Sequence, residues 1–585
     1  MKRTWVLAAG FSASGWFAAN AGAENAARPL GEPVLEQPTL RCFGAYWVVE
    51  GDDNRNAVVH ADYRKAGEPA WKRALPFFRV ERDAHKGGEH GSRVVVPAGA
   101  WLFAGSVLDV DPATAWELRL RLEDPDGGKA ERILQARTIA EPVFAPDPAL
   151  TFHVMPGDGG GTGSAASPFR GLDAAQKAAR PGACFLLAPG VYAGAFEVRA
   201  SGEPGRPVVW RGDGTGEAVL DGAAAGGKRV KRVVMASGLH DVWFERLTIR
   251  NGDYGLAANG SSRFVVRRCR IHGCDYGLVS QINTDGAVRG HFIADNVIEG
   301  PSTWPRSKGI ENARGIQVTG EGHVVCRNRV RGFADAIDTF PSPVCAAIDI
   351  HHNDLETLTD DGIELDYSER NTRCFRNRLT NVFQGISLQP VFGGPVYVFR
   401  NVLANVAAEP FKLHNSPSGG LIFHNTSVKR GMPAQLSTPE RVRNFVFRNN
   451  LFVGTGGAYA FECQPPMEGC DFDYDGFAGR EPFRMFLKWG GVRYATLAEV
   501  RFKAPVYRHA VQADAGSLFA IPVAMPADEA APWGPPDLRL RAGSPAIDAG
   551  APWPGINDGF AGSAPDLGAL ELGSAPQPVG PRPER

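Results

Sequence analysis

The chain of 585 residues has almost no net charge, since 63 Lys and Arg are balanced by 64 Asp and Glu. That balance gives no reason to expect a nucleic acid or an anionic membrane surface as partner. The nine cysteines are scattered without metal-ligand spacing, and Cys463 and Cys470 are the best local candidates for a disulfide. Beyond the N-terminus no apolar run approaches the length that spans a bilayer. We therefore expect a folded protein with no membrane span, and the length predicts at least two domains.

The N-terminus reads MKRTWVLAAGFSASGWFAANAGAE. Lys2 and Arg3 precede an apolar run, and Ala21, Gly22 and Ala23 supply the small residues of a cleavage site. We expect residues 1–23 to be a signal peptide and the mature protein to be secreted or periplasmic. A membrane anchor is the alternative, which the shortness of the run disfavours.

Residues 33–143 contain short runs that alternate apolar and polar residues, such as AYWVVEG and AVVHADYRK. Several such runs in about 100 residues indicate a small β-sandwich. The stretch VDPATAWELRLRL resembles a fibronectin type III domain, although Trp116 stands where that family has the Tyr of its corner. The region has no catalytic cluster, so we expect a spacer or a glycan-contacting module, with structural support as the plainer interpretation.

The rest of the chain repeats. The motifs RNRV, HNDL, RNRL, RNVL, HNTS and RNNL place Asn at positions 328, 353, 377, 401, 425 and 449, with a period of 24 or 25 residues. Apolar residues flank this position at fixed offsets, and the same register continues upstream through Asn296. Such a period without a helical pattern indicates a parallel β-solenoid. We expect the Asn column to be structural, lying in turns, tolerating left-handed backbone and bonding to the next rung.

Two segments resemble a known family. GDGGGTGSAASPFRGLDAAQKAARPGACFLLAPGVYAGAFEV (157–198) resembles the opening of secreted right-handed parallel β-helix proteins of the pectate-lyase-like type, where a short helix caps the first coil. RAGSPAIDAG and PDLGALE (within 541–571) are similar to the C-terminal signature of the same group. The resemblance implies an all-β chain with a right-handed parallel β-helix over residues 150–573. We expect residues 574–585 to form a disordered tail. Polysaccharide lyases, glycoside hydrolases, uronan epimerases and phage-type glycan binders share this fold, so the resemblance does not select a reaction.

Each coil has another strand about eight residues after the Asn position. Aligned, these read GLAAN (255–259), GLVSQ (277–281), GIQVT (315–319), AIDTF (336–340), GIELD (362–366), GISLQ (385–389) and PFKLH (410–414). The second residue is always apolar and is expected to point inward, so the third and fifth should face solvent. The middle rungs are dense in polar residues. The candidate site residues on this face are Gln317, Asp335, Asp338, Asp361, Glu364, Asp366, Gln389, Lys412 and His414.

Asp338 and Glu364 should stand side by side, because neighbouring rungs are about 4.8 Å apart. Two carboxylates at that distance raise one pKa, which suits an acid and a base. A separation of about 5 Å matches retaining glycosidases, while the diagonal pair Asp338 and Asp366, about 8 Å apart, falls in the inverting range. We predict an extracytoplasmic enzyme that hydrolyses glycosidic bonds of a polysaccharide with Asp338 and Glu364 as catalytic pair and Asp366 as base, with no cofactor required.

Two alternatives stay open. In a calcium-dependent polysaccharide lyase, Asp338, Glu364 and Asp366 would hold calcium and Lys412 would abstract a proton, although nearby carboxylates disfavour a lysine base. The other alternative is a noncatalytic glycan-binding or cell-surface scaffold. We expect a monomer. The candidate substrate-binding residues are Gln317, Asp335, Asp361, Gln389, His414 and Trp304.

Two loop motifs complete the prediction. The loop EGPSTWPRSKGIENAR (299–314) could wall a groove, with Trp304 stacking on a sugar and Arg306 or Lys308 contacting it. NTDG (283–286) resembles a polygalacturonase motif, and DDG (360–362) resembles the paired aspartates of that family. In polygalacturonases the two motifs lie one coil apart. Here the two motifs are about three coils apart, so we interpret NTDG as a turn.

Overall fold

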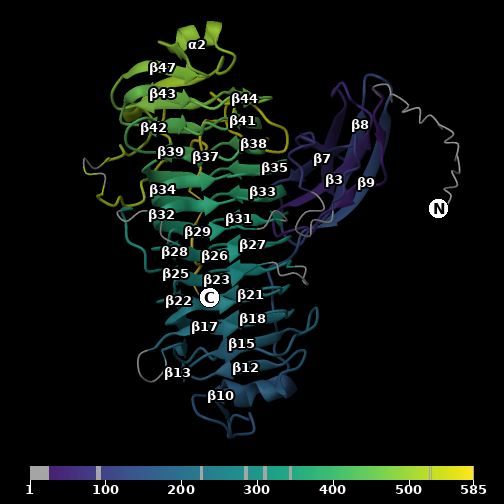
Figure 1. The fold of residues 1–585 in the computed structure, drawn as a ribbon, viewed down its shortest axis with the longest axis vertical. Coiled ribbons are helices and arrows are strands. Elements are labelled where there is room, and N and C mark those ends of the chain that lie inside the picture. Colours follow the sequence, from purple (N-terminus) through teal and green to yellow (C-terminus); the bar gives the residue numbers. More distant parts are fainter. Residues whose placement is uncertain are drawn as a thin grey trace, which may run out of the picture.

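The computed structural model describes residues 25–86, 94–223, 228–281, 288–306, 312–341, 345–525, 528, 530–576 and 578–583. Figure 1 shows a β-sandwich lying beside a long β-solenoid. The predicted all-β class, with small sheets preceding a right-handed parallel β-helix, is confirmed. The predicted signal peptide lies outside the described residues. Within the described ranges, no helix is long and apolar enough to cross a membrane.

The N-terminal domain packs two antiparallel sheets around an apolar core. Its strands are β1 (Arg28–Pro29), β2 (Val34–Leu35), β3 (Phe43–Glu50), β4 (Val58–Lys65), β5 (Lys72–Arg73), β6 (Phe78–Val80), β7 (Trp101–Val107), β8 (Ala115–Glu123) and β9 (Lys129–Arg137). One sheet has the order β1-β3-β7-β6, with β2 beside β3, and the other has the order β5-β4-β8-β9. Trp116 is buried between Phe43 and Tyr63. The fibronectin type III resemblance stays a prediction.

The solenoid is built from three parallel ladders, which we number by the order in which a coil passes through them. The first ladder contains β10 (Thr151–Met155), β12 (Cys184–Leu187), β15 (Val208–Gly212), β18 (Val242–Glu245), β21 (Val265–Arg267), β24 (Phe292–Ala294), β27 (Val324–Cys326), β31 (Asp349–His351), β33 (Ser368–Phe375), β35 (Phe392–Phe399), β38 (Ser418–Phe423) and β41 (Val442–Arg448). Close to its start, α1 (Leu172–Ala175) lies in the segment for which the resemblance implies a capping helix.

The second ladder contains β13 (Gly190–Ala193), β16 (Ala218–Asp221), β19 (Thr248–Arg250), β22 (Arg270–His272), β25 (Val297–Glu299), β28 (Arg329–Arg331), β32 (Asp354–Glu364), β34 (Arg378–Ser387), β36 (Val402–Val406), β39 (Thr426–Val428), β42 (Leu451–Gly454), β46 (Gly476–Gly479) and β49 (Val511–Asp514). The third ladder contains β14 (Phe196–Glu197), β17 (Val230–Met235), β20 (Gly252–Ala257), β23 (Tyr276–Ser280), β26 (Arg314–Val318), β29 (Asp335–Asp338), the ends of β32 and β34, and β37 (Phe411–Lys412). Because β32 and β34 are long enough to turn the corner, they belong to both ladders.

A buried asparagine ladder ties the coils together where the first ladder passes into the second. Each side-chain amide donates to the carboxamide oxygen of the next rung at 2.9–3.0 Å, which is the bonding expected from the repeat. The left-handed backbone belongs to the residue before each Asn, such as Arg376 at φ 55°. The predicted last position is wrong by one residue, because Asn450 rather than Asn449 accepts from Asn425. The ladder comprises Asn296, Asn328, Asn353, Asn377, Asn401, Asn425, Asn450 and Asp475.

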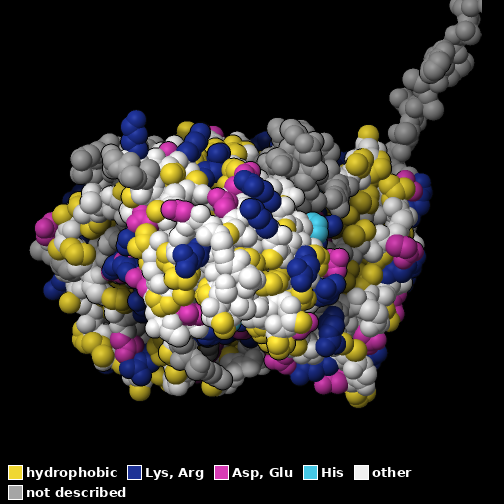
Figure 2. Space-filling view, turned by 90° about the horizontal axis from the view of Figure 1, so that it is seen from below, with side chains coloured by type: hydrophobic (Ala, Val, Ile, Leu, Met, Phe, Trp, Pro, Cys, Tyr) yellow, Lys and Arg dark blue, Asp and Glu magenta, His cyan; other side chains and the backbone are white. Residues whose placement is uncertain are grey.

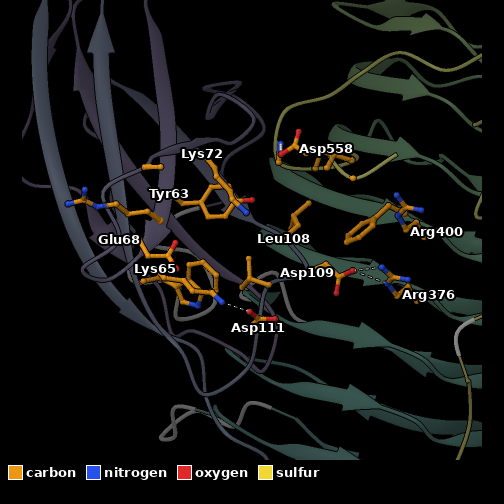
Figure 3. Close-up of a pocket in the computed structure, with 18 residues that line it drawn as sticks. Tyr63, Lys65, Glu68, Lys72, Leu108, Asp109, Asp111, Arg376, Arg400 and Asp558 are labelled. Atoms are coloured by element: carbon orange, nitrogen blue, oxygen red, sulfur yellow. Dashed lines mark hydrogen bonds and ion pairs between the residues drawn. The ribbon is translucent and has the colours of Figure 1, made fainter. Parts of the chain in front are cut away.

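Two ion pairs, one of them buried, fix the sandwich against the first ladder. Arg370 pairs with Glu36 at 2.6 Å, and Arg376 pairs with Asp109 at 2.5 Å. A cavity of about 340 Å³ lies at this junction. Figure 3 shows Arg376 and Arg400 on its solenoid side and Tyr63 on its sandwich side. The surface seen in Figure 2 mixes cationic and anionic side chains, in keeping with the near-zero net charge.

The C-terminal part closes the solenoid and then returns along it. The last coils carry β40 (Ala434–Leu436), β43 (Gly457–Cys463), β47 (Phe483–Trp489), β48 (Val492–Tyr494) and α2 (Leu497–Lys503), and α2 lies at the upper end in Figure 1. The described part of the predicted disordered tail lies against the solenoid, where Arg582 pairs with Asp295 at 2.6 Å. All nine cysteines are described and remain free thiols, so Cys463 and Cys470 form no disulfide here.

Candidate functional site

The third ladder brings the predicted polar column into register. Asp338 pairs with Glu364, which confirms that these carboxylates occupy neighbouring rungs. The column continues to Ser387 and then to Lys412. The isoleucines between the outward positions are fully buried in the solenoid core: Ile316, Ile337, Ile363 and Ile386.

A second outward column runs beside the first. Tyr254 pairs with Tyr276, which pairs with Arg314, and Arg314 pairs with Asp335. The backbone N–H of Asp361 donates to the Asp335 carboxylate at 2.9 Å. At the neighbouring Gly362 a Cβ would lie 2.6 Å from the Gly385 carbonyl oxygen, so glycine lets the rungs approach at this corner.

Arg314 is the centre of the carboxylate cluster. Its Nη1 lies 2.5 Å from Asp335 Oδ2, 2.8 Å from Asp338 Oδ2 and 2.9 Å from Glu364 Oε2. Gln317 also donates to Asp338 Oδ2, at 3.1 Å. One guanidinium therefore holds carboxylates from two successive rungs together, which offsets the repulsion expected between them.

Two more cations reach the cluster from other parts of the solenoid. Lys412 Nζ lies 2.8 Å from Asp361 Oδ2. Arg306 Nη1 lies 3.4 Å from Asp360 Oδ1, and its guanidinium lies 4.2 Å from the centre of the Phe383 ring. Arg306 lies in the loop that was predicted to wall a groove, and this contact places Arg306 itself at the edge of the cluster.

Burial raises the pKa values of the five aspartates near Arg314 and Lys412. It raises the pKa of Asp338 to about 8, with Arg314 opposing and Glu364 adding to the rise. It raises the pKa of Asp361 to about 7, with Lys412 opposing. The pKa values of Asp335, Asp360 and Asp366 are also raised, chiefly by burial. Asp338 therefore keeps its proton at neutral pH, in keeping with the prediction that one pKa of the Asp338 and Glu364 pair rises.

Only part of the cluster reaches solvent, and this corrects the prediction for Asp338. Its side chain is 0% exposed because Arg314 and Gln317 bond to it from the outer side of the sheet. Glu364 is 12% exposed and Asp360 is 17% exposed. Alternation along a strand gives the direction of a side chain but not what covers it.

The fifth column is less uniform than predicted. Asp366 is buried, and its Oδ1 accepts from Ser387 Oγ and from the backbone N–H of Gln389, so this carboxyl is engaged in the turn rather than free to act as a base. His414 is half-buried and lies 3.5 Å from Glu409, and Gln389 is half-buried. Their roles in binding stay predictions.

The predicted aromatic contact is less direct. Trp304 is half-buried, and its Nε1 has no partner in the described part of the chain. Lys308 and the NTDG motif lie outside the described residues. Lys412 does not suit the role of base, because the Asp361 carboxylate raises its pKa above the ordinary value despite burial.

The predicted calcium ligands do not come together as a set. The carboxylates whose oxygens lie within 4.8 Å of one another are instead Asp335, Asp361 and Glu364. Arg314 bonds to two of these three and Lys412 bonds to the third. Because calcium takes six to eight oxygen ligands and cationic side chains already occupy these carboxylates, the residues do not fit a calcium site, and we derive no step through a metal.

A pocket of about 240 Å³ adjoins the cluster on the rungs before it. Stacked rings of Tyr254 and Tyr276, with centroids 4.7 Å apart, form one wall, and Arg232 and Arg314 also line it. No candidate site residue was predicted on these rungs, because their third-column residues are Ala257 and Val279. The repeated DYGL in GDYGL and CDYGL was the available signal.

Among the comparisons with known proteins, the match to a family model agrees with the fold. A family model described as right handed beta helix region matches residues 233–389. No curated protein matches. XylC in complex with xylose is similar at 12% identity and a TM-score of 0.45, covering 58% of this chain and 86% of that one.

Two further solved structures are similar over most of their own length. The catalytic unit of a GH87 α-1,3-glucanase from Streptomyces thermodiastaticus shows 11% identity and a TM-score of 0.32, covering 84% of this chain and 97% of that one. A polygalacturonase from Erwinia carotovora shows 12% identity and a TM-score of 0.30, and the match covers 57% of this chain and 95% of that one. At these scores the similarities carry no argument about the reaction or the substrate.

Proposed function

We propose that this chain is an extracytoplasmic enzyme that hydrolyses glycosidic bonds of a polysaccharide at the carboxylate cluster of the third ladder. The observation that carries the proposal is the cluster itself, in which carboxyls of raised pKa stand beside a partly exposed carboxylate and a polar pocket. Carboxyls with altered proton affinity in a cleft are typical of acid–base sites. The arrangement is costly as surface decoration, because like charges on neighbouring rungs repel.

The two carboxyls that contact the sugar are Asp360 and Glu364, because both are partly exposed to solvent. Asp360 has a raised pKa and reaches solvent, so it serves as the proton donor to the leaving oxygen. Glu364 reaches solvent from the same strand and serves as the base or nucleophile. The buried carboxyls Asp335, Asp338 and Asp361 act through these two by holding protons and by fixing Arg314 and Lys412.

Arg314 also positions the Glu364 carboxylate in this proposal. It donates to Glu364 and so fixes the carboxylate in one orientation before the substrate binds. It also spans the cluster and the adjoining pocket, because it lines both. A sugar chain lying along the third ladder would therefore meet the pocket and the carboxylates in sequence.

The test is release of reducing sugar from a panel of polysaccharides by the full chain and its variants. Glu364→Gln and Asp360→Asn should each lower turnover about 10²–10⁴-fold. Glu197→Gln is the matched control, because Glu197 lies on β14 of the same ladder and is 51% exposed. Full turnover by Glu364→Gln would remove the proposal.

Two outcomes favour the alternatives. Ultraviolet absorbance of an unsaturated product would favour a lyase over a hydrolase. Binding of a glycan without any cleavage by the wild-type chain would favour the scaffold.

A further inference from the structure

The pocket beside the cluster has a charge opposite to that of the cluster. Its lining includes two arginines, and no Asp or Glu is among the described residues that form it. Asp253 and Asp275, which flank the tyrosines in sequence, are directed to Arg229 at 3.8 and 3.4 Å. An anionic group would therefore meet cations on the wall of this pocket, and the nearest cluster carboxylates lie behind Arg314 and Gln317 at the far end of it.

Of the two arginines that line the pocket, Arg232 has no ion-pair partner among the described residues. Its guanidinium lies 5.6 Å from the centre of the Tyr254 ring, and no carboxylate pairs with it in the described part of the chain. Arg314, at the other end of the tyrosine column, uses Nη1 for all three of its carboxylates. A guanidinium without an acid at a pocket wall is suited to bind a carboxylate in bidentate fashion.

The rest of the wall is suited to hydroxyl groups. Gln281 donates to Gln317 at 2.8 Å, and Gln317 donates in turn to Asp338. This chain of amides fixes the orientation of Gln281 and leaves its carbonyl oxygen able to accept a second bond. The stacked Tyr254 and Tyr276 place two phenol groups beside it. A pocket of about 240 Å³ is small for a drug-sized ligand and suits a single ring.

We propose that this pocket is a subsite for a uronic acid unit of the polysaccharide, with Arg232 binding the sugar carboxylate and Gln281, Tyr254 and Tyr276 binding its hydroxyls. This inference rests on the proposed function for the identity of the ligand as a glycan. Arg232 lies three rungs from Arg314 along the column, or about 14 Å. The carboxylate of the acidic unit thus binds at the end of the pocket farther from the cluster, and the substrate is a polysaccharide in which uronic acid contributes to recognition rather than to the bond cleavage.

The test measures binding apart from cleavage. The full chain carrying Glu364→Gln is titrated calorimetrically with uronate-containing oligosaccharides and with the same oligosaccharides after reduction of their carboxyl groups. We expect carboxyl reduction to weaken binding about tenfold, as for loss of one charge-assisted hydrogen-bonded contact. Added salt should weaken binding of the acidic form more than binding of the reduced form.

Variants then assign the effect to the pocket. Arg232→Gln should weaken binding of the acidic form about tenfold and leave the reduced form unchanged. Arg199→Gln is the matched control, because Arg199 is 66% exposed and pairs only with Glu197 among described carboxylates. Tyr276→Phe should weaken both forms, since it removes one hydroxyl contact.

Three outcomes would overturn the inference: equal binding of acidic and reduced forms, equal behaviour of Arg232→Gln and Arg199→Gln, or no binding of any acidic oligosaccharide. Cleavage of a neutral glycan together with any of these would overturn the subsite and leave the proposed hydrolysis standing. Carboxyl-dependent binding that Arg232→Gln abolishes, without cleavage by the wild-type chain, would support the subsite and overturn the hydrolysis.

Discussion

Replacing Asp338 by Asn should make the protein less sensitive to alkaline pH. Burial raises the pKa of Asp338 from 3.8 to about 8 in the folded chain. Each unit corresponds to about 1.4 kcal/mol of differential stability between the two protonation states. Full deprotonation of this buried carboxyl therefore costs the fold on the order of 5 kcal/mol.

Because the pKa of Asp338 is raised in the folded chain, the wild type loses stability as pH rises. The folded chain binds the Asp338 proton more tightly than the unfolded chain, so the stability that this proton confers is complete below about pH 4 and is lost as pH rises toward 8. Asparagine has nearly the shape of the protonated carboxyl and does not titrate. The stability of the variant relative to the wild type should thus increase from pH 5 to pH 9, and the variant should be the more stable at pH 9.

Thermal unfolding followed from pH 5 to pH 9 measures this difference. The midpoint of Asp338→Asn should exceed that of the wild type by several degrees at the alkaline end, and the gap should narrow toward pH 5. Asp253→Asn is the control, because that aspartate is exposed and should give a constant gap. A gap for Asp338→Asn that does not change with pH, or that is widest at pH 5, would refute the reasoning about burial.

Two other predictions concern the coils and the metal. Asn377→Ala removes an amide that accepts from the backbone and side chain of Asn353 and should cost about 3 kcal/mol in denaturant unfolding, whereas the exposed Asn54→Ala should change little. An equal effect of the two would show that the asparagine ladder adds nothing to stability. Treatment with EDTA should leave glycan cleavage and the unfolding midpoint unchanged, because Arg314 and Lys412 already neutralise the carboxylates. A loss that calcium restores would place a metal in the cluster.

The period of the solenoid could be predicted because burial repeats it. An inward Asn and its inward apolar neighbours recur every 24 or 25 residues, and any other register would expose them. The prediction of the last Asn position fails because the same pattern fits two neighbouring residues. In RNNL both Asn449 and Asn450 fit the pattern, and only the next rung, where Asp475 accepts from Asn450, decides between them.

The candidate site could be predicted only in part, because the direction of a side chain on a strand does not predict how much of it is exposed to solvent. Adjacent rungs put Asp338 beside Glu364 as expected. Arg314, which lies on the preceding strand and covers Asp338, decides which carboxylate meets solvent. The tyrosines were missed because the predicted third column passes through Ala257 and Val279 on those rungs, while the rings belong to the neighbouring column.

The crowding of carboxylates in TDDGIELDYSE becomes understandable once the whole column is considered. Six acidic side chains on two rungs would repel one another if each were ionised and unpaired: Asp335, Asp338, Asp360, Asp361, Glu364 and Asp366. Arg314 enters from the rung before and Lys412 from a later one, and burial keeps protons on several of the acids. Charge along the third ladder therefore changes from cationic at Arg232 to acidic at the cluster and to cationic again at Lys412. A sugar chain whose acidic unit prefers the Arg232 end would lie on this face in one direction only, so the ladder would fix which of its bonds reaches Glu364.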